Sequence, residues 1–149
     1  MKVHPDFSDF ISVLNRRRVQ YVIVGAFALA YHGEPRATGD IDLWIRPMSR
    51  NAQLLLRAIR DLGFKSLDLT EEDLLSGKVI QLGYPPVRID LLTRLDGLTA
   101  DEIWASRKTG KFGNHRVTFL GKKAFIKNKR AVGRHKDLAD IESLGEKPA

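Results

Sequence analysis

The sequence contains no cysteine, and it has no long apolar run. Disulfide bonds and thiolate metal sites are therefore excluded. The longest apolar run, residues 21–31, has 11 residues, whereas a membrane-spanning helix needs about 20. The first ten residues, MKVHPDFSDF, carry aspartates where a signal peptide would be apolar. These absences predict a cytoplasmic protein that does not enter a membrane.

The composition that remains is ordinary for a globular protein. Of the 149 residues, 43% are hydrophobic and 29% are charged, which suits a chain that buries a proper core. Neither an internal repeat nor a low-complexity segment interrupts it. We therefore expect one domain over residues 1–149, with a core at about 19–120 and a basic helical tail at about 121–145.

Acidic residues are scarce in the last third of the chain. The net charge is +7, and residues 105–149 contain 12 Lys/Arg against 4 Asp/Glu, whereas residues 1–104 contain 13 against 14. The whole basic excess therefore lies near the C-terminus. Such a patch suits a phosphate-bearing partner, but a lysine-rich, solvated surface has the same composition.

Hydrophobic periodicity and turn residues predict an alternation of helices and strands. One predicted helix begins near Pro5, and others cover about 26–31, 49–62, 100–106, 122–132 and 135–144; residues 70–73 resemble a capping box. The predicted strands are 21–24, 41–46, 79–82, 87–92 and 116–120, the last at an edge. Ser49 is the expected N-cap of the helix that ends at Leu62, and Thr70 begins the capping-box pattern. The expected fold is α/β (α+β), with a mixed sheet of about four or five strands flanked by helices.

Two aspartates interrupt an otherwise buried strand in the segment TGDIDLWI. Because side chains alternate along a strand, Asp40 and Asp42 share one face, roughly 7 Å apart. Asp90 has the same position in the strand VRIDLL, on the face of Arg88, and joins them if the two strands pair. Three carboxylates on one face require cations, and oxygen ligands favour Mg²⁺ or Mn²⁺. The alternative is an edge strand whose aspartates face solvent.

A possible phosphate site precedes this strand. Strand 21–24 runs into Gly25 and Ala26 and then into a helix, so free backbone N–H groups and the positive end of the helix meet there. Many strand–Gly–helix turns bind nothing. Beside three carboxylates, however, this turn predicts a triphosphate cradle that faces a metal site.

The segment VGAFALAYHGEPRATGDIDLWI resembles the signature of the nucleotidyltransferase superfamily, which has the polymerase-beta-like fold. Gly25 matches the first position of its turn, Asp40 and Asp42 its Asp-hydrophobic-Asp pair, and Asp90 its third carboxylate. The tail NKRAVGRHKDLADIESL resembles that of abortive-infection-type toxin nucleotidyltransferases and their small relatives. The resemblance covers about Val19 to Leu144. Ala26 departs from it, since the family has a second Gly or a Ser there.

The resemblance implies a two-metal transfer of a nucleoside monophosphate from an NTP to a hydroxyl acceptor. In this implied transfer, the metals are held by Asp40, Asp42 and Asp90, and Asp90 lies near the acceptor hydroxyl. The residues expected to contact the nucleotide are Gly25, Ala26, Arg36, Thr38, Lys129, Arg134 and Lys136. The last three could instead grip an RNA backbone or form a solvated surface.

Three functions remain open from the sequence. The basic tail favours an RNA acceptor, and the resemblance suggests the toxin of a toxin–antitoxin pair with an antitoxin partner. The alternatives are transfer to a small hydroxyl compound, or a degenerate domain that only binds nucleotide, nucleic acid or a protein. Trp44 is expected to pack under a helix or to stack on a base, and Asp137 and Asp140 to cap or salt-bridge the last helix.

Overall fold

Apolar residues build the middle of a mixed sheet. A computed structural model describes residues 3–33, 39–63, 68–84 and 87–147. In it, strand β1 (Tyr21–Val24) is buried along its whole length. It pairs antiparallel with β2 (Asp40–Ile45) and parallel with β6 (His115–Phe119). Strand β2 pairs parallel with β4 (Val87–Leu92), and the hairpin strands β3 (Ile80–Tyr84) and β5 (Lys108–Phe112) lie at the two edges.

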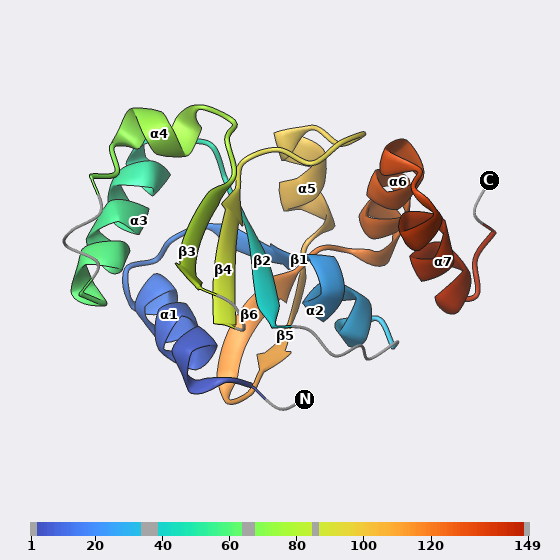
Figure 1. Cartoon of the computed structure of the whole chain (residues 1–149), viewed down its shortest axis with the longest axis horizontal. Helices are drawn as coiled ribbons and strands as arrows, with labels where there is room; N and C mark the ends of the chain where they lie inside the picture. The colour runs from blue at the N-terminus through green and yellow to red at the C-terminus, as the bar shows by residue number, and fades with distance from the viewer. Residues whose placement is uncertain (1–2, 34–38, 64–67, 85–86, 148–149) are drawn as a thin grey trace.

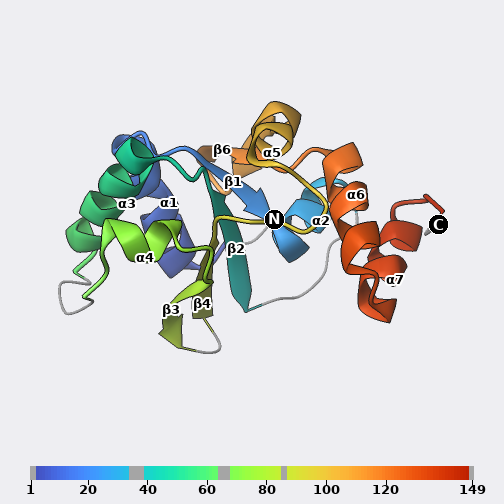
Figure 2. The ribbon, with the colours of Figure 1, turned by 90° about the horizontal axis from the view of Figure 1, so that it is seen from above.

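Helices cover both faces of this sheet (Figures 1 and 2). In chain order they are α1 (Pro5–Arg16), α2 (Gly25–Tyr31), α3 (Ser49–Asp61), α4 (Glu71–Leu75), α5 (Ala100–Ser106), α6 (Lys122–Val132) and α7 (His135–Ser143). Helices α1 and α3 lie on one face, and α5 and α6 lie on the other (Figure 2). The predicted α/β domain with a mixed, helix-flanked sheet is confirmed.

The alternation along β2 divides its residues between two apolar cores. Ile41, Leu43 and Ile45 are buried in the core beneath α1 and α3. Trp44 points the other way and is completely buried beneath α5 and α6. Asp40 and Asp42 share the face of Trp44, at the end of the strand beyond the apolar core. Base stacking by Trp44 is therefore wrong, and the packing alternative is right.

Two sequence expectations about the sheet need correction. Strand β6 is not an edge strand, because it lies between β1 and β5. Strand β5 was not predicted, and it brings the sheet to six strands within the described residues. Its sequence, KTGKF, buries only Phe112, so it has no apolar alternation for a pattern to detect. Pairing with β6 orders it instead.

Helix starts were predicted with mixed success. Thr70 caps α4 through a capping box with Asp73, as expected. The N-cap of α3 is Met48 rather than Ser49, and no side chain caps it. The Ser49 hydroxyl donates instead to Glu71, which ties α3 to α4. Within the described part of the chain, no helix has the length and apolarity needed to cross a bilayer.

Candidate active site

The register between β2 and β4 brings carboxylates together. Asp42 is paired with Asp90 across the parallel strands, and Asp40 is paired with Arg88. Because register partners project to the same face, all four side chains line one side of the sheet. Asp90 is 7% exposed, and it acts electrostatically on the carboxyl group of Asp42. Strands β2 and β4 thus present a carboxylate pair, with Asp40 beside it.

Arg88 is the cation that the structure places among these carboxylates. Its Nη2 lies 2.9 Å from Asp40 Oδ2, and its Nε lies 3.0 Å from Asp90 Oδ1. Nη2 also donates to Asp90 Oδ2 at 3.2 Å. From the sequence, Arg88 was assigned to the face of Asp90, but the compensation of charge was assigned to metal ions. The guanidinium already neutralises part of that charge.

The pKa of Asp42 is strongly raised in this site. Burial raises the pKa of its carboxyl group to about 6, and the charge of Asp90, the hydrogen bond with Asp90 and the charge of Asp40 act in the same direction. Lys129 opposes them. The ionised form of Asp42 is therefore held at a cost, and a cation bound there would remove that cost.

Gly25 joins the first turn to this cluster. Its φ is +66°, and a Cβ atom placed on it would collide with the Asp42 carboxylate. Only glycine combines this backbone conformation with so close an approach. Ala26, the second residue of α2, is partly exposed beside it. The turn that was predicted to hold phosphate thus packs directly against the metal-ligand candidate.

A cleft of about 400 Å³ opens between this end of the sheet and the C-terminal helices. Gly25 and Asp42 form one wall, and α6 and the start of α7 form the other. Its lining residues are Val24, Gly25, Asp42, Leu92, Arg94, Leu95, Asp96, Asn128, Lys129, Val132, Arg134 and Asp137. The basic tail therefore folds back toward the carboxylates.

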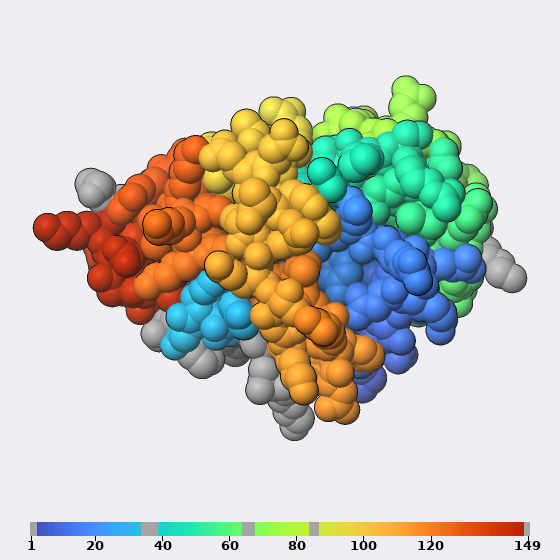
Figure 3. Space-filling model, turned by 180° about the vertical axis from the view of Figure 1, so that it is seen from behind, coloured from blue at the N-terminus to red at the C-terminus, as the bar shows by residue number. Residues whose placement is uncertain are grey.

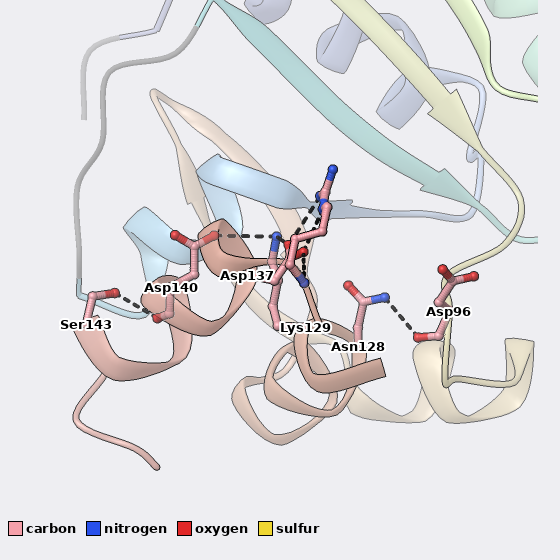
Figure 4. Close-up of polar contacts among 7 residues, drawn as sticks. Asp96, Asn128, Lys129, Asp137, Asp140 and Ser143 are labelled. Carbon is pink, nitrogen blue, oxygen red and sulfur yellow. Dashed lines mark hydrogen bonds and ion pairs between the residues drawn. The ribbon is translucent and has the colours of Figure 1, made fainter. Parts of the chain in front are cut away.

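Lys129 is fixed on that wall by two buried aspartates (Figure 4). Its Nζ lies 3.3 Å from Asp137 Oδ1 and 3.5 Å from Asp140 Oδ2. Arg134 Nε donates to Asp137 Oδ2 at 2.7 Å, and this bond, with Lys129, lowers the pKa of Asp137 to about 2. The two aspartates therefore form the ion pairs of the last helix that the sequence suggested.

The cleft includes residues that the sequence analysis did not select. The Asn128 amide donates to the backbone carbonyl of Asp96 at 2.9 Å, which ties the segment after β4 to α6 (Figure 4). Arg94 and Asp96 come from that same segment. These three are isolated polar residues without a spacing pattern, so only the tertiary contacts reveal them.

The structure places the remaining predicted nucleotide contacts differently. Arg36 and Thr38 lie outside the described residues, so their roles stay predictions. Arg134 lines the cleft, but its guanidinium is bonded to Asp137. Lys136 is exposed on α7 and is not among the residues that line the cleft.

The donor set suits a hard divalent cation only in part. Asp42 and Asp90 supply oxygen ligands and a partly uncompensated negative charge, as Mg²⁺ prefers. Within the ranges that the structure describes, no three His, Cys, Asp or Glu side chains are arranged to hold a metal ion. Asp40 and Asp90 are both bound by Arg88, so a three-carboxylate site requires that Arg88 withdraw.

Comparison with known proteins supports the fold. The structure aligns with the crystal structure of "a putative nucleotidyltransferase" from Thermotoga maritima with a TM-score of 0.59. The alignment covers 97% of this chain and 93% of that one, at 13% sequence identity. The chain has a nucleotidyltransferase-like fold. No protein-family model matches the sequence, and neither does any curated protein. The toxin role and the antitoxin partner stay predictions.

Proposed function

We propose that this protein is a metal-dependent nucleotidyltransferase that transfers a nucleoside monophosphate from an NTP to a hydroxyl group of RNA. One observation carries the proposal: Asp42 and Asp90 meet on adjacent parallel strands, and the Gly25 turn packs against Asp42. In a nucleotidyltransferase-like fold, this is the arrangement that the sequence resemblance requires.

The carboxylates of Asp40, Asp42 and Asp90 would hold Mg²⁺ or Mn²⁺. The bound metal would neutralise charge that develops on the phosphates during transfer. Asp42 and Asp90 must be ionised for this role, and the raised pKa of Asp42, about 6, sets the pH above which its carboxylate is available. Arg88 orients Asp40 and Asp90 through its ion pairs with both carboxylates.

The opposite wall of the cleft would bind the triphosphate. Asp137 and Asp140 hold the ammonium group of Lys129 within electrostatic reach of Asp42. An ammonium fixed in this way is positioned before the nucleotide arrives, which reduces the entropy lost on binding. Backbone N–H groups at Gly25 and Ala26 would face the phosphates from the sheet side.

The test is transfer itself. The protein is incubated with each radiolabelled NTP, Mg²⁺ and total RNA, and label on RNA is measured after electrophoresis. The wild type should label RNA, and Asp42→Asn should not, because the amide keeps the shape of the side chain but loses its charge. Equal labelling by both proteins would refute the proposal. Label on a small hydroxyl compound but never on RNA would retain the transferase and replace the acceptor.

A further inference from the structure

A second hollow lies on the other side of α6 from the cleft. It has a volume of about 600 Å³, within the range of about 300–1,000 Å³ that is typical of ligand pockets. Helices α5 and α6 pack against each other there, and Figure 3 shows the face to which both contribute, in gold and orange. We name it the α5–α6 groove; its charged lining residues are Glu102, Lys108, Lys122, Lys123 and Lys127.

The charge of the α5–α6 groove is strongly positive. Four lysines face one glutamate, and Lys127 binds that glutamate at 2.6 Å. Lys122 makes a longer ion pair, 3.7 Å, with Glu146. Lys108 and Lys123 are exposed and form no ion pair with any residue that the structure describes. The groove therefore has at least two cations available for an anionic ligand.

The lysines of the groove belong to a segment of the sequence that is rich in cations. No Asp or Glu occurs from Ile103 to Lys136, a stretch of 34 residues that contains 11 Lys/Arg. On the cleft side of α6, Lys129 and Arg134 are bound to buried Asp137. The exposed cations Lys108 and Lys123 on the groove side therefore differ from Lys129 and Arg134, which are paired with an aspartate.

The lining of the groove indicates which part of a nucleic acid would bind. Its apolar residues are Leu98, Ala105 and Ala124, and no aromatic residue or arginine is among the described lining residues. Bases stack on aromatic rings and on arginine, whereas lysine acts as a point charge toward phosphate. The groove therefore suits a sugar–phosphate backbone, bound without regard to sequence.

The groove and the cleft are lined by two shared elements. Lys127 lines the groove, while its neighbours Asn128 and Lys129 line the cleft, so α6 is a wall of both. The segment after β4 lies between them, with Asp96 in the cleft and Leu98 in the groove. The two hollows are therefore neighbours along both elements.

We propose that the α5–α6 groove binds the phosphate backbone of the RNA acceptor and directs its hydroxyl end into the carboxylate cleft. This inference rests on the proposed function for its ligand. It assigns acceptor binding to Lys108, Lys122, Lys123 and Lys127, and leaves the nucleotide to the cleft.

The test is the affinity for a labelled single-stranded RNA, measured by fluorescence anisotropy at several salt concentrations without NTP or Mg²⁺. Each phosphate contact contributes about −0.7 to the log–log salt slope for single strands. The double variant Lys108→Gln/Lys123→Gln should therefore reduce the slope by about 1.4 units. The control, Arg57→Gln/Arg60→Gln, removes the same charge from exposed positions of α3, on the opposite face of the sheet, and should leave the slope nearly unchanged.

Three outcomes would overturn the inference: equal slopes for the groove variant and the wild type, equal losses in both double variants, or equally tight binding of polyglutamate. The first can occur while the protein still labels RNA, in which case the proposed function stands and the groove is wrong. If the groove variant loses RNA affinity but neither it nor the wild type labels RNA, RNA binding by the groove is supported and the proposed transferase activity is refuted.

Discussion

At Asp42, burial and the neighbouring carboxylates raise the pKa to about 6, whereas an unfolded aspartate has a pKa of about 3.9. Between these values the folded protein holds a proton that the unfolded chain has lost. The contribution of Asp42 to the free energy of unfolding is therefore largest below about pH 4 and falls as the pH rises to about 6. The ionised Asp42 carboxylate that would bind a metal ion therefore lowers the free energy of unfolding.

Asp42→Asn should raise the free energy of unfolding near neutral pH by about 1–3 kcal/mol, after allowance for partial solvent exposure. It should also remove the part of the pH dependence between about pH 4 and 6. Thermal denaturation across this range in a chelator measures both effects. The control is Asp61→Asn, because the pKa of this exposed carboxylate is lowered by Arg17 rather than raised. A lower stability of Asp42→Asn at neutral pH would contradict the assignment.

Arg88 provides a second prediction at this scale. Arg88→Gln leaves Asp40 and Asp90 without their guanidinium partner, so the metal-free protein should lose about 1.5–3 kcal/mol, as for other hydrogen bonds to charged groups. Mg²⁺ should then raise the melting temperature of the variant more than that of the wild type, because the ion no longer competes with Arg88.

The matched control for this prediction is Arg17→Gln. It breaks a contact of similar length, 2.7 Å to Asp61, at the exposed surface. Such pairs contribute little to stability, and Mg²⁺ should act on this variant as on the wild type. If Mg²⁺ stabilises Arg88→Gln no more than Arg17→Gln, Arg88 does not occupy the place of a metal ion.

The turn between β1 and α2 determines how closely the backbone approaches the carboxylates. Gly25→Ala should be destabilising for two reasons, its φ of +66° and the collision with Asp42. Gly145→Ala has only the first cost, because the φ of Gly145 is +79° and no atom lies within 4 Å of a Cβ placed there. A left-handed conformation costs an L-residue about 1–2 kcal/mol.

The difference between these two variants isolates the contact with Asp42. Chemical denaturation should show a larger loss for Gly25→Ala than for Gly145→Ala, and the Gly25 variant should also bind Mg²⁺ more weakly, because Asp42 is displaced. Equal losses, with unchanged Mg²⁺ binding, would show that the turn and the carboxylate are independent.

Across the whole molecule, one sheet separates two apolar cores. Phe10 lies in the core under α1 and α3, and Phe125 of α6 lies in the core under α5 and α6, each 1% exposed. Phe10→Ala and Phe125→Ala should each cost about 3–5 kcal/mol. Each variant should lower the midpoint of a single cooperative unfolding transition, because β1 and β2 contribute residues to both cores.

This prediction tests the single-domain organisation expected from the sequence. Circular dichroism in the near- and far-ultraviolet should report the same midpoint for each variant. If Phe125→Ala instead unfolds α6 and α7 in a separate, earlier transition, the basic tail is a unit of its own, and its position over the cleft is not fixed by the core.

The sequence alone determined those elements that have a strong local cause. The bounds of β1, β4, α5 and α6 follow from apolar runs and periodicity, and the capping box at Thr70 follows from residues three apart. The alternation along β2 placed Asp40 and Asp42 on one face before any partner strand was known. These features depend only on neighbours in the chain.

The tertiary structure decided what depends on residues distant in sequence. Strand β5 exists because β6 pairs with it, and Arg88 lies beside Asp40 because of the register between β4 and β2. The segment after β4 joins the cleft through Asn128, 32 residues further along the chain. Local patterns predict which face of an element a side chain lies on. Long-range pairing and packing decide which charges meet on that face, because hydrogen-bond register and helix docking depend on both partners.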